Sequence, residues 1–457
     1  MDLSTIVKAY DVRGVVPDQL DEDVARAIGA AFVDVLQCPK ILTAHDMRDS
    51  GPSLSRAFAE GAISRGADVV EAGLASTDML YFGSGSLDLP GAMFTASHNP
   101  ARYNGIKLCR AGAVPVGQDT GLTEIRLRAQ NYLRHGLPAF DRPHGVYSET
   151  ALLDSYARYL RSLVDLSAIR PLRVVVDAGN GMGGYTVPAV LGGELLEPLP
   201  LTIIDMYFEL DGAFPNHEAN PLEPANLVDL QARVVSEGAD IGLAFDGDAD
   251  RCFVIDAAGA PVSPSAVTAL VAARELAKEP GANVIHNLIT SRAVPEVITE
   301  QGGVPIRTRV GHSFIKAEMA RVDAVFGGEH SAHYYFRDFW RADTGMLAAM
   351  HVLAALGGQA GTLAELTAEY ERYAASGEIN STVDDAAARV VDVRASFAGE
   401  TDSVDELDGV TIGLTDGSWL NIRVSNTEPL LRLNVEATSA ERMIEVRDQA
   451  LAVIRKT

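Results

Sequence analysis

A serine followed at once by a histidine and an asparagine stands out in the first quarter of the chain. Ser97, His98 and Asn99 lie directly after the apolar residues 91–94 and are followed by Pro100. A serine hydroxyl is a weak nucleophile until a neighbouring group activates it, and proline fixes the backbone where the segment ends. The segment therefore predicts a reactive serine, although an ordinary Ser/Asn/Pro turn would have the same composition.

A cluster of acidic residues forms the second candidate site. Asp246, Asp248 and Asp250 alternate within one turn between two apolar runs. Carboxylate oxygens in this arrangement suit Mg²⁺ or Ca²⁺. An EF-hand loop would need Gly at its sixth position and Glu at its twelfth, where this chain has Arg251 and Ala257. We therefore expect a divalent cation for phosphate chemistry, with a phosphate on the reactive serine as a further ligand.

Length and composition limit the classes of protein open to this chain. Its 457 residues exceed what one hydrophobic core serves and predict about three or four domains. The net charge of -24 argues against binding to nucleic acid or to an anionic membrane, so local cations must hold an anionic substrate. Three widely spaced cysteines, and an N-terminus without the apolar segment of a secretory signal, favour a cytoplasmic protein with reduced thiols.

One pattern of strands recurs three times. In each repeat an apolar strand, a helical stretch and a second strand precede a third apolar run that ends in a polar loop. The first strands are expected at 41–43, 174–176 and 283–285, the second at 68–70, 202–204 and 304–306, and the third at 93–94, 243–245 and 324–326. The third runs lead to Ser97, to Asp246 and to the segment 329–333. Ligands collect beyond the carboxyl ends of strands in open α/β sheets, so we expect these loops to face one cleft.

The repeats predict three consecutive α/β domains of similar topology with mixed sheets, and a smaller C-terminal α+β domain, around a central active-site cleft. The expected boundaries are 1–147, 148–257, 258–377 and 378–457, at breaks rich in Gly, Pro, Ser or acidic residues. The fourth domain contains a turn that begins at Arg423 and is followed by Arg432. Arginine beside hydroxyls and free backbone amides is suited to holding a phosphate group.

These four motifs resemble those of the α-D-phosphohexomutases, the family of phosphomannomutases and phosphoglucomutases. The resemblance covers the whole chain and keeps the order of a phosphoserine loop, a metal loop, a sugar loop at 329–333 and a phosphate loop at 423–427. It implies that a phosphorylated Ser97 gives its phosphoryl group to a hexose monophosphate. The hexose 1,6-bisphosphate then turns over and returns its other phosphate, so that mannose 6-phosphate and mannose 1-phosphate interconvert, with action on glucose phosphates in dual-specificity members.

The resemblance also assigns the site residues. The catalytic residues that it implies are Ser97, His98, Lys107 and Arg13, with Lys107 ranked above His98 for proton transfer. The metal ligands are Ser97, Asp246, Asp248 and Asp250. The substrate-binding residues are Arg251, His312, Glu329, Ser331, His333, Arg423, Ser425, Asn426 and Thr427. The implied cofactors are Mg²⁺ and an activating hexose 1,6-bisphosphate, and the partners are hexose phosphates, with neither nucleic acid nor membrane, in a monomer or homodimer.

Two departures from the family pattern affect these assignments. Many relatives carry a lysine near Ile289, where Arg292 is the cation that could replace it. The segment 44–48 replaces a glycine-led version, so a small shift of that loop is expected. The sugar loop resembles the phosphomannomutase and dual-specificity versions more than the glucosamine-specific one, and phosphoglucomutase and phosphoglucosamine mutase remain alternatives.

Two alternatives belong to other classes. The segment Gly179 to Gly184 fits G-x-G-x-x-G after a strand, and Asp205 follows about twenty residues on, which is the pattern of a nicotinamide-dependent dehydrogenase. That reading leaves the serine, the three aspartates and the phosphate loop unexplained. A sensor that binds sugar phosphates without catalysis is the other alternative, and the intact Ser97 and metal loop argue against it.

Overall fold

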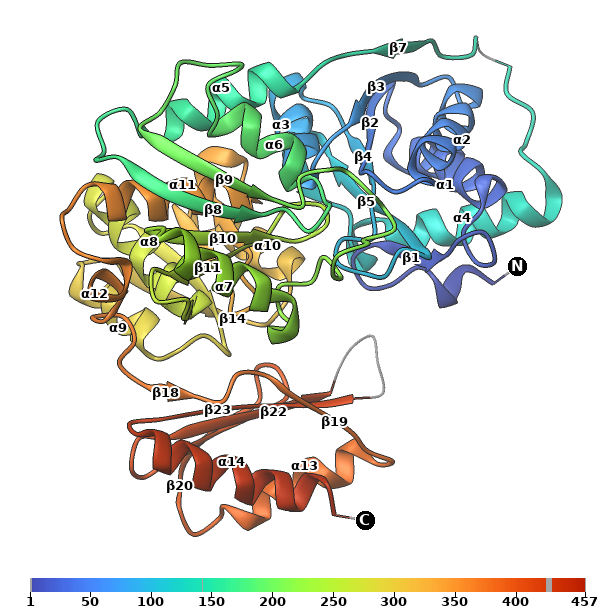
Figure 1. Ribbon diagram of the computed structural model, residues 1–457. Coiled ribbons are helices and arrows are strands. Elements are labelled where there is room, and N and C mark those ends of the chain that lie inside the picture. The colour runs from blue at the N-terminus through green and yellow to red at the C-terminus, as the bar shows by residue number, and fades with distance from the viewer. Residues whose placement is uncertain (1, 142, 425–429, 457) are drawn as a thin grey trace. The chain divides into compact units, whose positions relative to one another are not determined.

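The computed structural model describes residues 2–141, 143–424 and 430–456 (Figure 1). They form two compact units, Met1–Val262 with Ser331–Leu366, and Ser263–His330 with Thr367–Thr457. Ser425, Asn426 and Thr427 of the expected phosphate loop lie outside the described residues. Within the described part of the chain, no helix combines the length and the apolar character needed to cross a membrane.

The first sheet is mixed and has seven strands in the order β1-β5-β4-β2-β3-β7, with β6 beside β5. The strands are β1 (Val12–Val15), β2 (Lys40–His45), β3 (Asp68–Leu74), β4 (Gly91–Phe94), β5 (Tyr103–Arg110), β6 (Val114–Pro115) and β7 (Tyr147–Glu149). The helices of this segment are α1 (Glu22–Leu36), α2 (Gly51–Ser64), α3 (Thr77–Leu87) and α4 (Leu122–His135). Strands β4, β2 and β3 are parallel and β5 is antiparallel to β4.

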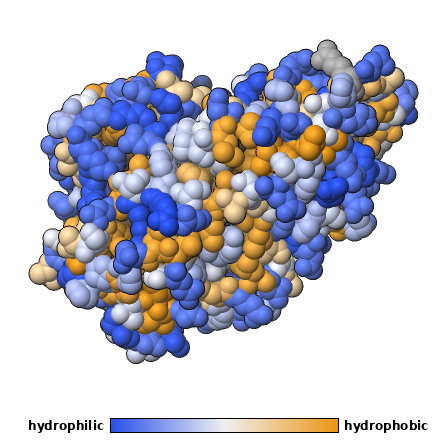
Figure 2. All heavy atoms as spheres, turned by 90° about the horizontal axis from the view of Figure 1, so that it is seen from above, coloured by the Kyte–Doolittle hydropathy of each residue, from blue (hydrophilic) through white to orange (hydrophobic). Residues whose placement is uncertain are grey.

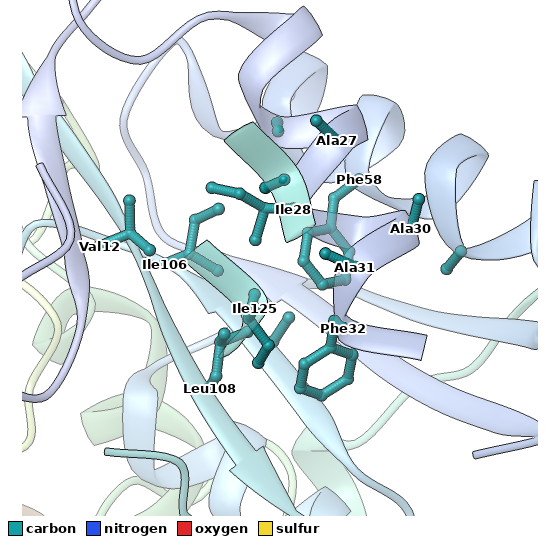
Figure 3. Packing of buried hydrophobic residues seen from close by; sticks show 14 of the residues in the cluster. Val12, Ala27, Ile28, Ala30, Ala31, Phe32, Phe58, Ile106, Leu108 and Ile125 are labelled. Atoms are coloured by element: carbon teal, nitrogen blue, oxygen red, sulfur yellow. The ribbon is translucent and has the colours of Figure 1, made fainter. Parts of the chain in front are cut away.

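A buried apolar cluster joins this sheet to its helices (Figure 3). Phe32 of α1 and Phe58 of α2 have ring centroids 5.7 Å apart. Ile106 and Leu108 contribute from β5, and Ile125 from α4. Burial of such side chains is the main force that fixes the strands whose ends carry the polar loops.

The second sheet also belongs to the first unit and has the order β12-β11-β10-β8-β9. Its strands are β8 (Leu172–Asp177), β9 (Leu201–Met206), β10 (Ile241–Phe245), β11 (Cys252–Asp256) and β12 (Pro261–Val262). The helices of this segment are α5 (Leu153–Leu163), α6 (Gly183–Val190) and α7 (Val228–Glu237). The first unit further contains the hairpin of β16 (Tyr334–Phe336) and β17 (Ala342–Asp343), followed by α11 (Gly345–Gly357).

The second unit begins with a third parallel set of strands. These are β13 (Asn283–Asn287), β14 (Val304–Thr308) and β15 (Phe326–Gly328), and the helices are α8 (Pro264–Lys278), α9 (Ala293–Glu300) and α10 (His312–Val322). The third strand was expected from residue 324 but begins at Phe326, because the backbone N–H of Ala324 bonds to Met319 O and closes the end of α10. The short helix α12 (Leu363–Thr367) spans the point where the chain passes into this unit again.

The C-terminal part of the second unit is an antiparallel sheet with two helices. The strands are β18 (Ala374–Ala375), β19 (Ile379–Thr382), β20 (Thr401–Asp405), β21 (Val410–Leu414), β22 (Trp419–Val424) and β23 (Leu430–Ala437), and the helices are α13 (Ala386–Ser396) and α14 (Ala440–Ile454). Alternation along β22 gives the sheet two different faces. Leu420 and Ile422 enter the core with the helices, whereas Trp419, Asn421 and Arg423 share the opposite face.

The three repeats have the same strand order. The third strand of each repeat lies beside the first, and the first beside the second, in the parallel sets β4-β2-β3, β10-β8-β9 and β15-β13-β14. The predicted α/β repeats with mixed sheets and the C-terminal α+β domain are therefore confirmed. Each polar loop follows the carboxyl end of a parallel strand, which is where α/β sheets bind ligands. Polar residues, with apolar ones between them, cover the face of the molecule drawn in Figure 2.

Candidate active site

Ser97 lies in the loop after β4 and is almost fully buried. Its backbone has a φ of +50°, a conformation that residues other than glycine rarely adopt and that clusters at functional sites. Its Oγ donates a hydrogen bond to Asp246 Oδ2 at 2.9 Å, although these residues are 149 positions apart. The loops after β4 and β10 thus place the predicted serine against the predicted metal loop.

The three aspartates of the metal loop are buried, and each presents a carboxylate oxygen within 4.8 Å of the others. Asp248 Oδ1 and Asp250 Oδ1 are buried and accept no hydrogen bond within the described residues. A buried carboxylate oxygen without a donor is costly unless a cation binds it. The donor set and these oxygens fit Mg²⁺, which prefers oxygen ligands.

Lys107 of β5 forms ion pairs with the metal loop. Its Nζ donates to Asp248 Oδ2 at 2.7 Å and to Asp250 Oδ2 at 2.6 Å. Burial opposes the charge of Lys107, but the two carboxylates outweigh burial and hold the pKa of the ammonium group well above its usual range. Thr77 at the start of α3 also donates to Asp248 Oδ2, at 2.5 Å, a contact that the sequence pattern did not reveal.

Arg251 connects the serine to the metal loop. Its guanidinium forms an ion pair with Asp246 at 2.6 Å and donates to Ser97 Oγ at 3.2 Å. It also contacts His98 Nδ1. Burial and the neighbouring Arg251 hold the pKa of His98 well below its usual range, so the imidazole is neutral and its Nδ1 accepts from the guanidinium. Ser97 Oγ also lies 3.2 Å from His98 Nδ1, but because that nitrogen accepts from Arg251 it is less available to take the serine proton.

Arg13 of β1 contacts the serine loop at Asn99. Its Nη1 donates to Asn99 Oδ1 at 2.6 Å, and its Nη2 pairs with Asp11 at 2.5 Å. Arg13 Nε is buried and has no hydrogen-bond partner within the described residues. The structure thus brings Arg13 to the second residue after the serine.

Arg48 is a site residue that the sequence analysis missed. Its side chain is buried and donates to four backbone oxygens of the serine loop, those of Ser97 at 2.8 Å, Asn99 at 2.7 Å, Pro100 at 3.1 Å and Tyr103 at 2.9 Å. Because guanidinium donors are arranged in a rigid fork, one arginine can satisfy several carbonyls at once. Arg48 therefore holds the shape of the loop that carries the serine.

Close packing of three loops explains the glycine pattern after β8. A Cβ atom on Gly181 would lie 2.7 Å from Gly247 O, and one on Gly247 would lie 2.5 Å from Ser97 O. Met182 N also donates to Gly247 O at 2.9 Å. These glycines are needed for the approach of one backbone to another, which accounts for the pattern without a dinucleotide.

Part of the expected sugar loop lies in the same unit as the serine. Ser331 Oγ and His333 Nδ1 are 2.9 Å apart, and His333 Nε2 lies 3.8 Å from Asp250 Oδ1. His333 also forms an isolated antiparallel bridge with Arg251. The structure therefore brings Ser331 and His333 to the edge of the metal loop.

The remaining predicted residues lie in the second unit. Glu329 Oε1 accepts from Asn287 Nδ2 at 3.1 Å and from the backbone of Gly311 at 3.2 Å. His312 is the first residue of α10, directly after that glycine. The end of β15 and the start of α10 thus come together at Glu329.

Arg292 is the cation that could replace the lysine that many relatives carry, and it has contacts of its own in the second unit. Its guanidinium donates to Gly417 O and lies over the ring of Tyr373, with its Cζ 5.1 Å from the ring centroid. These contacts fix the guanidinium within the second unit. Ile289 lines a cavity of about 340 Å³ in that unit, together with His330 and Trp419 among others.

Models of the phosphoglucomutase/phosphomannomutase family match four consecutive parts of the chain: alpha/beta/alpha domain I over residues 4–133, domain II over 154–259, domain III over 264–373 and the C-terminal domain over 378–453. The chain therefore belongs to this family, as its motifs predicted. It is a phosphohexomutase, an intramolecular phosphotransferase of the isomerase class.

Individual relatives match nearly the whole chain. A protein of Xanthomonas campestris pv. campestris named phosphohexose mutases is 41% identical over 451 residues, which cover 97% of this chain and 98% of the relative. A phosphomannomutase of Salmonella montevideo is 38% identical, with 99% of both chains covered. The crystal structure of a phosphoglucomutase/phosphomannomutase family protein from Burkholderia thailandensis has a TM-score of 0.87 and 31% identity, and the match covers 100% of this chain and 99% of that one.

Proposed function

We propose that this phosphohexomutase is a phosphomannomutase that interconverts mannose 6-phosphate and mannose 1-phosphate through a phosphorylated Ser97. The observation that carries the proposal is the contact of Ser97 Oγ with both Asp246 and Arg251. A buried hydroxyl between a carboxylate of the metal loop and a guanidinium is suited to carrying a phosphoryl group. The curated relatives named phosphomannomutase support the choice of sugar.

The proposed first step conserves atoms and charge. The bond between phosphorus and Ser97 Oγ breaks while a hydroxyl oxygen of the hexose monophosphate bonds to phosphorus. The hydroxyl loses a proton and Ser97 Oγ gains one. In the second step the bisphosphate returns its other phosphoryl group to Ser97 by the reverse chemistry. A hexose 1,6-bisphosphate would also activate an unphosphorylated enzyme, since it can transfer one phosphoryl group to Ser97 and leave a monophosphate.

Asp246, Asp248 and Asp250 would hold Mg²⁺ in this proposal, and the Ser97 phosphate would complete the ligand set. When bound, the ion supplies neutralisation of charge on the transferring phosphoryl group. Arg251 adds a donor directed at Ser97 Oγ, at 3.2 Å. Such fixed donors stabilise the charge that develops on the leaving oxygen.

Lys107 is ranked above His98 for proton transfer, and its raised pKa suits the ammonium group to delivering a proton rather than taking one. Lys107 Nζ contacts Asp248 and Asp250, so it lies beside the proposed reaction centre. His98 Nδ1 already accepts from Arg251, which leaves its ring to orient the loop. Arg13 is assigned to positioning through Asn99.

The residues proposed to bind the sugar phosphate are those that the motifs single out. They are Arg251, His312, Glu329, Ser331 and His333. The phosphate that does not react would bind to Arg423 and to Ser425, Asn426 and Thr427 of the same loop. Hydroxyl and carboxylate groups of this kind can pair with the hydroxyls of a sugar ring, and arginine suits its phosphate.

The test is turnover of mannose 1-phosphate and glucose 1-phosphate, measured separately with Mg²⁺ and a trace of hexose 1,6-bisphosphate. A higher kcat/KM for mannose 1-phosphate supports the proposal. Equal values would indicate a dual-specificity enzyme, which the Xanthomonas relative named phosphohexose mutases makes the second candidate. Turnover of neither sugar would overturn the proposal and direct attention to an amino-sugar phosphate.

A further inference from the structure

Two arginines stand directly opposite each other at the end of the C-terminal sheet. Arg423 of β22 and Arg432 of β23 are register partners in the antiparallel pair. Partners of this kind place their side chains on the same face of a sheet, and like charges in this position repel each other. The side chain of Arg423 is 8% exposed, so bulk water screens little of its charge.

A single carboxylate bridges these arginines. Glu378 Oε2 lies 2.6 Å from Arg423 Nη2, and Glu378 Oε1 lies 3.0 Å from Arg432 Nη1. Glu378 immediately precedes β19, which pairs with β23 and thereby places Asn380 opposite Arg432. The bridge is therefore fixed by the sheet and is not a chance contact of three mobile side chains.

The bridge resembles the contact that a phosphate group would make. A carboxylate and a phosphate both present oxygens that guanidinium groups bind through charged hydrogen bonds. Arg423 Nε is buried and has no hydrogen-bond partner within the described residues, so Glu378 leaves part of the donor capacity of Arg423 unused. A ligand with more oxygens and more charge could use it.

We propose that Glu378 is an internal substitute for the substrate phosphate, which holds Arg423 and Arg432 while phosphate is absent and exchanges with it on binding. The proposal rests on the assignment of Arg423 to the phosphate site in the proposed function. Without Glu378, release of phosphate would deprive the buried guanidinium of Arg423 of its carboxylate partner beside a second arginine, which is costly. Glu378 lowers that cost, and so it weakens phosphate binding and speeds release.

Exchange of this kind suits a mutase. The bisphosphate must leave the phosphate site and bind there again by its other end before the second transfer. Tight binding of the first phosphate would slow this reorientation, because binding energy shared by every state does not speed a reaction. Glu378 is therefore a positioning residue that acts through the two arginines.

The experiment compares binding of inorganic phosphate to the full chain by calorimetry in four forms: wild type, Glu378→Gln, Arg423→Gln and Glu400→Gln. Glu400 pairs with Arg442 elsewhere in the C-terminal domain, which makes Glu400→Gln the matched control. We expect Glu378→Gln to bind phosphate roughly fivefold more tightly, on the scale of a partly exposed charge pair, and Glu400→Gln to match wild type. In turnover, Glu378→Gln should lower both KM and kcat.

Each outcome separates the two proposals. Weaker binding in Arg423→Gln with unchanged or weaker binding in Glu378→Gln would keep the phosphate site and overturn the role of Glu378. Unchanged binding in Arg423→Gln would remove Arg423 from the phosphate site and overturn the role of Glu378, whereas the mutase activity through Ser97 is decided separately by turnover of the sugar phosphates. If Glu378→Gln fails to fold, carbodiimide labelling of wild type decides: labelling of Glu378 should rise when phosphate saturates the protein, and no rise would refute the exchange.

Discussion

Arg48 Nη2 donates a hydrogen bond to the backbone oxygen of Ser97 at 2.8 Å, across 49 positions of sequence. The same guanidinium satisfies three further carbonyls of the loop, and its Cζ lies 5.1 Å from the ring centroid of Phe214. The serine loop thus depends on a buried cation that does no chemistry itself. Its backbone is held before any substrate arrives, as preorganised sites require.

Replacement of this cation should distort the serine loop. Arg48→Lys keeps the charge but loses the forked donors, so several buried carbonyls lose their partners. We expect a loss of about 2 to 4 kcal/mol in stability and a lower kcat. Thermal unfolding and hydrogen exchange of residues 97–103 check this. Arg56→Lys, at an exposed arginine, is the control, and equal effects of the two substitutions would contradict the prediction.

Removal of the serine hydroxyl should abolish turnover while ligand still binds. We expect both Ser97→Ala and Ser97→Gly to lose activity by roughly a thousandfold or more, because neither can carry the phosphoryl group. The glycine variant suits the φ of +50° and controls for backbone strain. Turnover and calorimetric binding of mannose 1-phosphate are the measurements. Full activity in either variant would refute the phosphoserine mechanism.

Neutralisation of one aspartate should weaken metal binding. Asp248→Asn removes a negative charge from the cluster and leaves Lys107 paired with Asp250. We expect the affinity for Mg²⁺ to fall roughly tenfold to a hundredfold, since ligand charge sets the affinity of such sites. Calorimetric titration with Mg²⁺ measures this. Asp240→Asn, which affects a partly exposed pair with Arg170, should bind the ion as wild type does; an equal loss there would point to a nonspecific charge effect.

His217 should make stability depend on pH. Its Nε2 lies 2.9 Å from Asp177 Oδ2, and its Nδ1 lies 2.9 Å from Glu218 O, so both ring nitrogens face acceptors. Burial opposes the charge of the ring, but Asp177 outweighs it and raises the pKa of His217. A raised pKa means that the folded protein binds the proton more tightly than the unfolded chain. The contribution is therefore complete below a pH of about 6.5 and is lost as pH rises through the folded pKa.

A pair of variants tests this dependence. The thermal midpoint of His217→Gln should lie below that of wild type at pH 6, and the difference should shrink at pH 9. His135→Gln, at an exposed histidine, should show no such change. An NMR titration that gives His217 an ordinary or lowered pKa would contradict the argument.

The arrangement of strands could be predicted because the sequence repeats its own pattern. Three apolar runs, each followed by a polar loop, imply three parallel sets with their loops at equivalent ends, and the structure has this order. The serine and the aspartates could be singled out because their residue types are rare in such spacing. Some residues that contact the aspartates could also be predicted. Lys107 and Arg251 lie within or beside recognisable motifs, and both pair with the metal loop.

Arg48 and Glu378 could not be identified in the same way. Neither belongs to a periodic pattern or to a cluster of reactive residue types, and each acts by reaching a distant segment. Arg48 contacts carbonyl oxygens, which every residue has, so the sequence gives no sign of its partners. A weak signal did exist for Glu378: the alternation of apolar and polar residues along β22 and β23 puts both arginines on one face, where a nearby acid is expected.

The tight stacking of the loops at Gly181, Gly247 and Ser97 limits how this centre can be transplanted. No methyl group fits between these backbones, so the main chain itself limits how closely the serine loop and the metal loop approach. If only the serine segment were transferred to another protein, it would lose the backbone contacts at Gly247 that fix the distance between the serine and the aspartates. The smallest portable unit is therefore the three loops, the strands β4, β8 and β10 that end in them, and the segment after β2 that carries Arg48.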